Sequence, residues 1–218
     1  MNLSNLNKAL ENDDVEGLQS MISTEEYANF RIVSSEKYIP VEIRFSCPVL
    51  TAAVFHHADN CIIYLLENGA KITNNDHWFT TIIHMSAKCG HLDYLADGSP
   101  FTSLKYDAQD WRGRTPLFYA IEAEKMECVK FLVDTKKVDI HMKDMFGNNC
   151  LHAAAESGNI EIYSFLFDKN CEEVENSQQK IPFLIAIEKG KLDLVKFLIE
   201  RSPELKNFKV GISLFVFL

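Results

Sequence analysis

The chain has 218 residues, of which 47% are hydrophobic and 24% are charged, and it contains 9 glycines and 6 prolines. These proportions are typical of a folded globular protein and exclude a disordered, collagen-like or low-complexity chain. The formal net charge of -9 argues against nonspecific binding to nucleic acid or to an anionic membrane, because either ligand requires a basic protein face.

Segments that would direct the chain to a membrane or to secretion are not found in the sequence. No apolar run reaches the roughly 18 residues of a membrane-spanning helix, and residues 1–10 lack the basic start and apolar stretch of a signal peptide. The cysteines are widely spaced and lack the close pairs of a zinc site, which indicates reduced thiols. They are Cys47, Cys61, Cys89, Cys128, Cys150 and Cys171. The sequence therefore predicts a cytoplasmic protein.

Residues 6–22 predict a pair of short helices joined by a polar turn at residues 12–14. The apolar positions of this pair are Ala9, Leu10, Val15, Leu18 and Met21. Residues 23–46 form a longer connection, and the alternation of Val41, Ile43 and Phe45 predicts a short strand within it.

From residue 46 onward, similar segments recur at a regular interval. His84, Phe118 and His152 follow one another at a spacing of 34. The same register extends back to Leu50 and forward to Leu184, which gives 5 related copies. Self-similarity at such a period is the sequence signature of a repeat architecture.

Each copy predicts two short helices with one apolar face. In the second helices, a phenylalanine and a leucine follow a polar residue, so that Leu132 is expected in the core and Lys130 on the outer face. Gly90, Gly158 and Gly190 fall between the two helices, where the backbone must turn.

Two copies and the C-terminus depart from this pattern. Residues 97–100, Asp-Gly-Ser-Pro, should end one second helix about a turn early and open a loop that continues through Tyr106. Residues 169–180 lack a Gly-Ala signal, which predicts a shortened finger. From about residue 211 a further copy begins but does not finish, so the apolar end is expected either to pack on the preceding copy or to promote self-association.

These motifs resemble the ankyrin repeat. TPLF at 115–118, CLHAAAESGNIEI at 150–162 and LLENGAKI at 65–72 match its Thr-Pro-Leu-His, Gly-His and Gly-Ala-Asp positions. The resemblance implies an all-α ankyrin-repeat solenoid of stacked helix-turn-helix units with short β-hairpin fingers. It comprises about 5 repeats at 46–218, with an incomplete sixth from about 211, after a degenerate N-terminal cap and connection at 1–45.

The expected finger tips carry large apolar and basic side chains. Aligned on Asp76, Asp110 and Asp144, they place both tryptophans in exposed turns, and tryptophan and arginine dominate many protein interfaces. The alternative is packing of each aromatic on the next finger, above all for Trp78, because Phe79 replaces the expected glycine. The partner-binding residues predicted at the tips are His77, Trp78, Trp111, Arg112, Arg114, Met145 and Phe146, and the resemblance adds Lys88, Glu122 and Glu156 on the concave face.

Catalytic signatures such as GxSxG, GxxxxGK[ST], GxGxxG and HExxH are not found. The resemblance implies that His84 and His152 hydrogen-bond neighbouring backbone. A metal site would use His57 and Cys61, an i,i+4 pair, together with His56 or Asp59. Because no CxxC partner accompanies that pair, no metal, cofactor or catalytic residue is assigned.

The sequence thus predicts a non-enzymatic module that binds an unidentified partner protein through its finger tips and the concave face of its first helices. Two alternatives belong to other classes. One is a fragment of a larger ankyrin-repeat protein whose enzymatic or membrane module is missing, which reading the gene beyond codon 218 decides. The other is a metal-dependent enzyme built on His57 and Cys61, which metal analysis decides.

Overall fold

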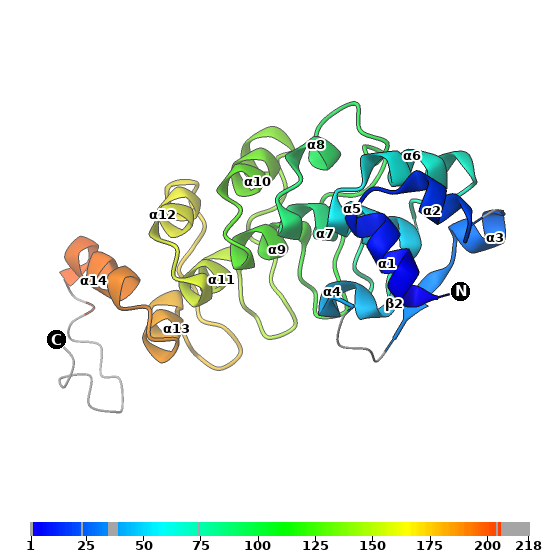
Figure 1. Cartoon of the computed structure of the whole chain (residues 1–218). Helices are drawn as coiled ribbons and strands as arrows, with labels where there is room; N and C mark the ends of the chain where they lie inside the picture. Colours follow the sequence, from blue (N-terminus) through cyan, green and yellow to red (C-terminus); the bar gives the residue numbers. More distant parts are fainter. Residues whose placement is uncertain (1, 23, 35–38, 74, 204, 206–218) are drawn as a thin grey trace.

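The computed structural model describes residues 2–22, 24–34, 39–73, 75–203 and 205, and it is an elongated array of short helices (Figure 1). The N-terminal elements are α1 (Leu3–Glu11), α2 (Val15–Gln19), α3 (Glu25–Ala28), β1 (Arg31–Val33), α4 (Val41–Arg44) and β2 (Phe45–Pro48). Five helix pairs follow. The first two are α5 (Val49–His56) with α6 (Asp59–Glu67) and α7 (Ile82–Cys89) with α8 (Leu92–Leu95). In the third, α9 (Pro116–Glu122) pairs with α10 (Met126–Lys130), which continues into the π-helical η1 (Phe131–Thr135); the last two are α11 (Cys150–Ser157) with α12 (Ile160–Asp168) and α13 (Pro182–Glu188) with α14 (Leu192–Arg201).

The helix pairs stack side by side into two rows (Figure 1). The first helices α5, α7, α9, α11 and α13 contact one another in succession, and the second helices α8, α10, α12 and α14 do the same. The connecting loops project from the first-helix row, on the side away from the second helices (Figure 1). Because each pair buries its apolar face only against its neighbours, this arrangement is the predicted all-α ankyrin solenoid.

Local sequence signals set the ends of the first helices. Thr81 and Asn149 cap the N-termini of α7 and α11 with their side chains, and Pro116 occupies the first turn of α9, where its missing N–H costs no hydrogen bond. Gly90 and Gly158 end α7 and α11 with positive φ angles of 87° and 82°. Glycine adopts this left-handed conformation without a Cβ clash, so the chain can reverse into the second helix.

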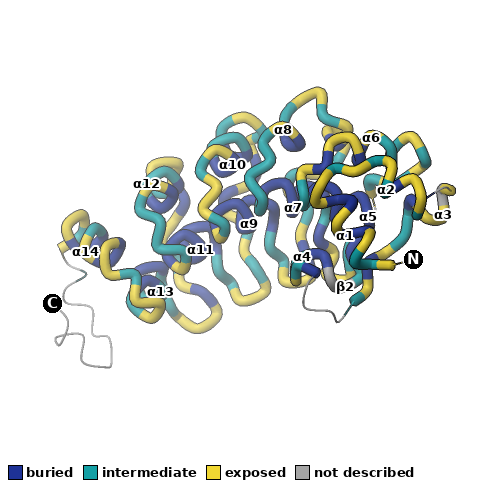
Figure 2. Tube along the Cα trace, in the orientation of Figure 1, coloured by how far each residue is buried: buried dark blue, intermediate teal, exposed yellow. Residues whose placement is uncertain are grey.

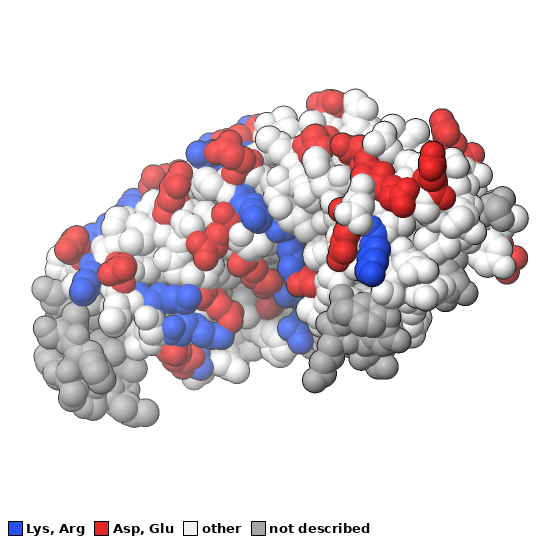
Figure 3. Space-filling view, in the orientation of Figure 1, with Lys and Arg blue, Asp and Glu red and all other residues white. Residues whose placement is uncertain are grey.

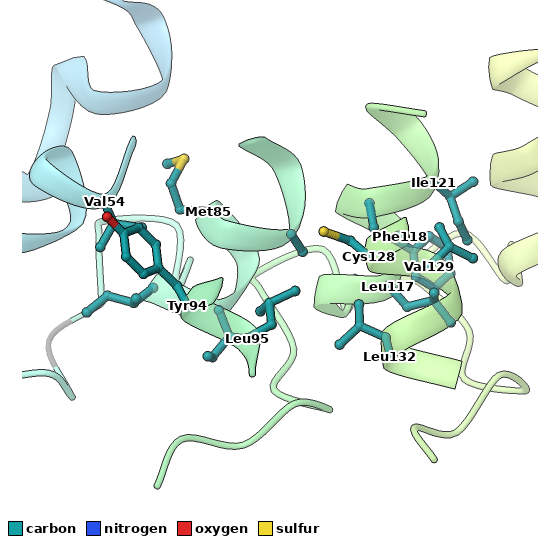
Figure 4. Close-up of a cluster of buried hydrophobic side chains, with 14 of the residues drawn as sticks. Val54, Met85, Tyr94, Leu95, Leu117, Phe118, Ile121, Cys128, Val129 and Leu132 are labelled. Carbon is teal, nitrogen blue, oxygen red and sulfur yellow. The ribbon is translucent and has the colours of Figure 1, made fainter. Parts of the chain in front are cut away.

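The core runs between the two rows as a continuous band of buried residues (Figure 2). Figure 4 shows its central part, where Leu117 and Phe118 of α9 lie near Val129 and Leu132 of the second helix. Leu132 is 0% exposed. Lys130 is only partly buried and pairs with the exposed carboxylates of Glu127 and Glu161. The predicted phase of this helix is therefore confirmed.

The early end predicted for one second helix is confirmed as well. Helix α8 stops at Leu95, and the following loop fills the space that a longer helix would occupy. Phe101 is fully buried and its ring meets that of Tyr94 edge to face at 5.8 Å. The hydroxyl of Tyr106 donates a hydrogen bond to the carbonyl oxygen of Leu95 at 2.8 Å. Side chains of the loop thus replace the missing helical turns.

The predicted strand at Val41, Ile43 and Phe45 is wrong in its position. Residues 41–44 form the single helical turn α4, which buries Ile43 and exposes Val41, whereas the strand is β2 at residues 45–48. β2 pairs antiparallel with β1, and Ile32 faces Cys47 in that register. Over so few residues an apolar alternation does not distinguish one turn of helix from a strand.

The predicted N-terminal helix pair is present as α1 and α2, with Leu10 and Leu18 fully buried. The incomplete copy predicted from about residue 211 lies outside the described residues. Within the described part of the chain, none of the helices combines the length and the apolar character needed to cross a bilayer.

Candidate functional site: the finger-tip groove

Each finger tip is a five-residue turn organised by one side-chain oxygen at its first position. In one tip, Oδ1 of Asp110 accepts hydrogen bonds from the backbone N–H groups of Arg112 at 2.8 Å and Arg114 at 2.9 Å. Asp76, Asp144 and Asn176 accept the same two bonds in their own tips. The fourth position of each turn has a positive φ and is occupied by Phe79, Gly113, Gly147 or Gln179.

The tip at Asn176 revises the prediction for residues 169–180. Asn176 follows Asp144 by 32 residues, whereas Asp144 follows Asp110 by 34. The missing two residues shorten the connection from α12, and the tip itself is complete, because an asparagine side chain supplies the same acceptor oxygen as an aspartate.

Successive tips are joined by backbone hydrogen bonds. The N–H of Trp111 donates to the carbonyl of Trp78 at 2.9 Å, that of Met145 to Arg112 at 2.7 Å, and that of Ser177 to Phe146 at 2.9 Å. These bonds link positions one repeat apart into a ladder along the edge of the array. The tips therefore form a continuous, ordered edge.

The tryptophans pack on each other and remain exposed. The ring centroids of Trp78 and Trp111 lie 5.0 Å apart, and the two residues keep 39% and 43% of their surface accessible. The guanidinium carbon of Arg112 lies 4.8 Å from the ring centroid of Trp111, within the range of a cation–π contact. His77 stands edge to face against Trp78 at 4.9 Å. These aromatic side chains thus pack on the neighbouring finger and also remain partly exposed to solvent, so both interpretations from the sequence apply.

Other predicted tip residues lie further along the same edge. Met145 and Phe146 are exposed on the next tip. Arg114 differs from them because its guanidinium is held below the tip. It donates to Oδ2 of the buried Asp110 at 2.9 Å, to the hydroxyl of Tyr119 at 3.0 Å and to Glu122 at 3.1 Å. Arg114 therefore braces the finger against α9, whereas Arg112 faces solvent.

Burial keeps the Tyr119 hydroxyl of this network protonated. The hydroxyl of Tyr119 donates to Oδ2 of Asp110 at 2.9 Å, and burial raises the pKa of Tyr119 to about 12. Asp110 thus accepts bonds from two backbone groups, a guanidinium and a phenol, which satisfies a carboxylate that is almost fully buried.

A groove of 560 Å³ lies between the tips and the first helices. It is lined by Val41, Glu42, Asp76, Trp78, Thr80, Met85, Lys88, Trp111, Arg112, Arg114, Tyr119, Glu122 and Ala123. Lys88 reaches across it to Glu42 of α4 at 3.3 Å. A second hollow of 560 Å³ shares Arg112, Arg114 and Glu122 and extends to Phe146 and Glu156. The predicted residues of the concave face therefore line two adjoining hollows together with residues of the tips.

Sequence reasoning missed several members of this groove. Val41 and Glu42 come from the N-terminal connection, which lies outside the repeat register, so periodicity could not place them. Tyr119 was available from the sequence, since a tyrosine five residues after an arginine at the start of a first helix can reach back to the tip. The charges are mixed in sign, because Arg114 and Glu122 pair within the groove and Glu156 pairs with Lys189 beyond it. Figure 3 shows acidic and basic side chains interspersed over the repeats on one face.

His84 and His152 connect first helices to neighbouring fingers, as the resemblance implied. Nε2–H of His84 donates to the carbonyl of Arg114 at 3.1 Å, and Nδ1 accepts from the N–H of Thr81 at 3.1 Å. His152 donates in the same way to the carbonyl of Lys180 at 2.9 Å. Burial lowers the pKa of His84 to about 4, so the ring is neutral near pH 7 and positions the finger.

The metal hypothesis that placed His57 and Cys61 on one helix face is wrong in that pairing. His57 ends α5 in a left-handed conformation with φ 57°, so the two residues do not share a helix. Cys61 is 0% exposed within α6, and burial raises the pKa of its thiol to about 12. Nε2 of His57 instead lies 2.9 Å from Oδ2 of Asp93 in the next repeat.

Known proteins resemble this chain through its repeats. A family model of ankyrin repeats (3 copies) matches residues 50–144 and 125–209. A transient receptor potential cation channel subfamily A member 1 homolog of Caenorhabditis elegans is 28% identical over 132 residues, which is 58% of this chain and 10% of that protein. Alpha-latrocrustotoxin-Lt1a of Latrodectus tredecimguttatus is 27% identical over 213 residues, covering 75% and 15%, and inversin of Danio rerio is 36% identical over 64 residues, covering 29% and 6%.

The chain thus spans a small part of each of these relatives, and what is shared is the repeat. The matched residues include the helix pairs from α5 to α14 and the tips between them. Together with the stacked helices and the His84 and His152 bonds, they establish that the chain belongs to the ankyrin-repeat family.

Proposed function

We propose that the chain binds a partner protein in the groove between its finger tips and first helices, with Trp78 and Trp111 as the central contacts. Ankyrin repeats generally mediate protein–protein interaction. The observation that carries the proposal is the pair of tryptophans packed against each other, which keep about two fifths of their surface in solvent while their backbone is held in the tip ladder. Exposed aromatic surface in a fixed position is typical of a binding site.

The order of the tips supports this assignment. A contact residue that is already held in place loses little conformational entropy when a partner binds, and more of the interaction energy remains as affinity. The tip ladder and the Asp110 turn hold Trp111, and Arg112 extends the exposed surface beside it. Tryptophan and arginine are the side chains most enriched among residues that dominate interface energies.

The ion pairs on the floor of the groove determine how partner affinity should depend on salt concentration. Lys88 is paired with Glu42, and Arg114 with Asp110 and Glu122, so the charges on the floor are largely neutralised within the chain. A partner that docks mainly on the tryptophans should therefore bind with a weak dependence on ionic strength. The proposal assigns the module no reaction of its own.

Site-specific photo-crosslinking tests where the partner binds. A benzophenone amino acid placed at Trp111 should crosslink a partner protein, and the same probe at Ile63 should not, because Ile63 is 55% exposed on α6 and lies outside the lining of the groove. Equal yields of the same partner from both positions would contradict binding at the groove.

Affinity measurements with the partner so identified provide the second test. Trp111→Ala should weaken binding by about 2 kcal/mol, roughly 30-fold in Kd, with little change in the urea midpoint. Ile63→Ala is the matched control and should bind like the unmodified chain. Full affinity of a stably folded double variant, Trp78→Ala with Trp111→Ala, would eliminate the tryptophans as contacts.

A further inference from the structure

A cluster of two histidines and an aspartate lies at the turns that join first helices to second helices. These turns are at the end of α7 opposite the finger tips. His57 follows α5, and His91 and Asp93 lie at the start of α8 in the next repeat. The imidazole rings of His57 and His91 stack with centroids 4.4 Å apart and an interplanar angle of 18°. Nε2 of His57 lies 2.9 Å from Oδ2 of Asp93.

We propose that His57, His91 and Asp93 bind a zinc ion that joins the two adjacent repeats. One ring nitrogen of each histidine and one carboxylate oxygen of Asp93 all lie within 4.8 Å of one another. Donor atoms at ordinary zinc bond lengths in a tetrahedral site are about 3.3 Å apart, so the three must move closer together. Because imidazole lone pairs lie in the ring planes, zinc binding also requires the two stacked rings to tilt away from parallel. Two imidazoles and a carboxylate are a donor set that zinc accepts, with a fourth position left for water.

The state of His91 is a second, independent observation. Its Nε2 atom is buried and has no hydrogen-bond partner among the residues that the structure describes. Most buried polar atoms in proteins have a partner, and an imidazole nitrogen without one is suited to bind a cation. Metal binding at His91 accounts for an atom that hydrogen bonding leaves unsatisfied.

Access and surroundings fit the same assignment. The side chains of His57 and Asp93 are 45% and 54% exposed, so an ion can enter from solvent without opening the core. The nearby carboxylate of Asp59 is engaged by the hydroxyl of Tyr94 at 2.5 Å, and the Tyr94 ring lies 5.1 Å from that of His57. Tyr94 thus contacts both histidine rings and holds the Asp59 carboxylate, which leaves His57, His91 and Asp93 as the donor set.

Zinc titration of the purified full chain tests the proposal. Isothermal calorimetry with Zn²⁺ should show one ion per chain and a higher midpoint of thermal unfolding, because a ligand that binds the folded state stabilises it. Mg²⁺, which prefers six oxygen ligands, should give neither effect. Absence of stoichiometric zinc would overturn the proposal and reduce the cluster to a hydrogen-bonded, stacked turn.

Surface variants locate the ion. His57→Gln and Asp93→Asn change half-exposed side chains, so folding should be retained, and each should weaken zinc binding by about tenfold or more. His77→Gln removes an exposed histidine at a finger tip, and Cys89→Ser removes a partly exposed thiol, and both should bind zinc normally. Zinc binding that survives His57→Gln and Asp93→Asn, or that disappears in Cys89→Ser, would refute the site.

Cobalt substitution identifies the donor atoms. Co²⁺ bound by nitrogen and oxygen donors shows visible d–d bands without the near-ultraviolet charge-transfer band of a thiolate. That spectrum is expected here, and a thiolate band would assign the ion to a cysteine instead. Because this cluster is separate from the finger-tip groove, its failure would leave the proposed partner site unaffected.

Discussion

Nε2 of His84 lies 3.1 Å from the carbonyl oxygen of Arg114, which joins the first helix of one repeat to the finger that enters the next. The imidazole is 0% exposed and neutral. Arg114 in turn braces the finger through Asp110, so the position of Trp111 depends on a chain of contacts that begins at His84. Protonation of the buried His84 ring should therefore destabilise the contacts that hold this finger in place.

Acid should destabilise the chain through His84. Burial lowers the pKa of His84 to about 4, whereas a histidine in the unfolded chain has a pKa of about 6.5. Between these values the unfolded chain binds more protons, so the free energy of unfolding falls as pH decreases, by roughly 3 kcal/mol in total. The contribution is fully present above pH 6.5. Urea unfolding at several pH values should show this loss, and in His84→Gln the dependence should be shallower. Parallel curves for the two proteins would contradict the assignment.

Leu132 and Lys130 test the packing of the second helix. Leu132→Ala removes a fully buried side chain between stacked repeats and should cost about 2 to 5 kcal/mol of unfolding free energy. Lys130→Ala removes only ion pairs with exposed carboxylates and should cost less than roughly 0.5 kcal/mol. Urea unfolding of both variants gives the comparison, and equal losses would show that the helix phase is wrong.

The buried carboxylate of Asp110 should matter more than its counterpart in the next tip. Asp110→Ala leaves the Arg114 guanidinium and the Tyr119 hydroxyl without their shared acceptor and should cost about 3 to 5 kcal/mol. Asp144→Ala removes the same turn but no arginine partner, since Asn148 occupies the equivalent position, and should cost about 1 to 2 kcal/mol. Thermal or urea unfolding measures the difference, and similar losses would mean that the ionic part of the network contributes nothing.

Two glycines with positive φ separate backbone strain from steric contact. A Cβ on Gly147 would lie 3.0 Å from the backbone N of Ser177 in the next tip, whereas one on Gly98 would meet no atom within 4 Å. Gly98→Ala should therefore cost only the strain of a left-handed alanine, about 1 kcal/mol. Gly147→Ala adds the contact with Ser177 and should cost about 2 kcal/mol or more. Equal unfolding midpoints for the two variants would show that the tip at Ser177 shifts to accommodate the new Cβ without loss of stability.

The repeat register made most of this fold predictable, because stacking brings residues one period apart into contact. Trp78, Arg112 and Phe146 are spaced by 34 residues and follow one another along the tip ladder. Segments outside the register gave weaker signals. Val41 and Ile43 alternate as a strand would, yet they lie in one helical turn whose position depends on packing against β1, β2 and α5.

Periodicity brings the turns that carry the histidine cluster together but does not predict the cluster itself. His57 ends α5 where Gly90 ends α7, 33 residues later, and His91 follows one position further on, so the stacking of the two rings is a feature of the three-dimensional structure. The pairing of His57 with Cys61 assumed an unbroken helix, but the left-handed residue between α5 and α6 turns the two side chains onto different elements. Local spacing indicates a shared face only while the helix continues.

The single turn of α8 has a mechanical consequence for the array. Its neighbour α10 continues directly into η1, so α8 is the short member of this row of second helices. Phe101 and Tyr106 of the following loop supply the apolar contacts that a longer helix would make. A stacked array under tension separates at its weakest junction between neighbours. Pulling the chain by its two ends should therefore divide it internally at this loop, into two blocks that rupture at different forces in single-molecule stretching.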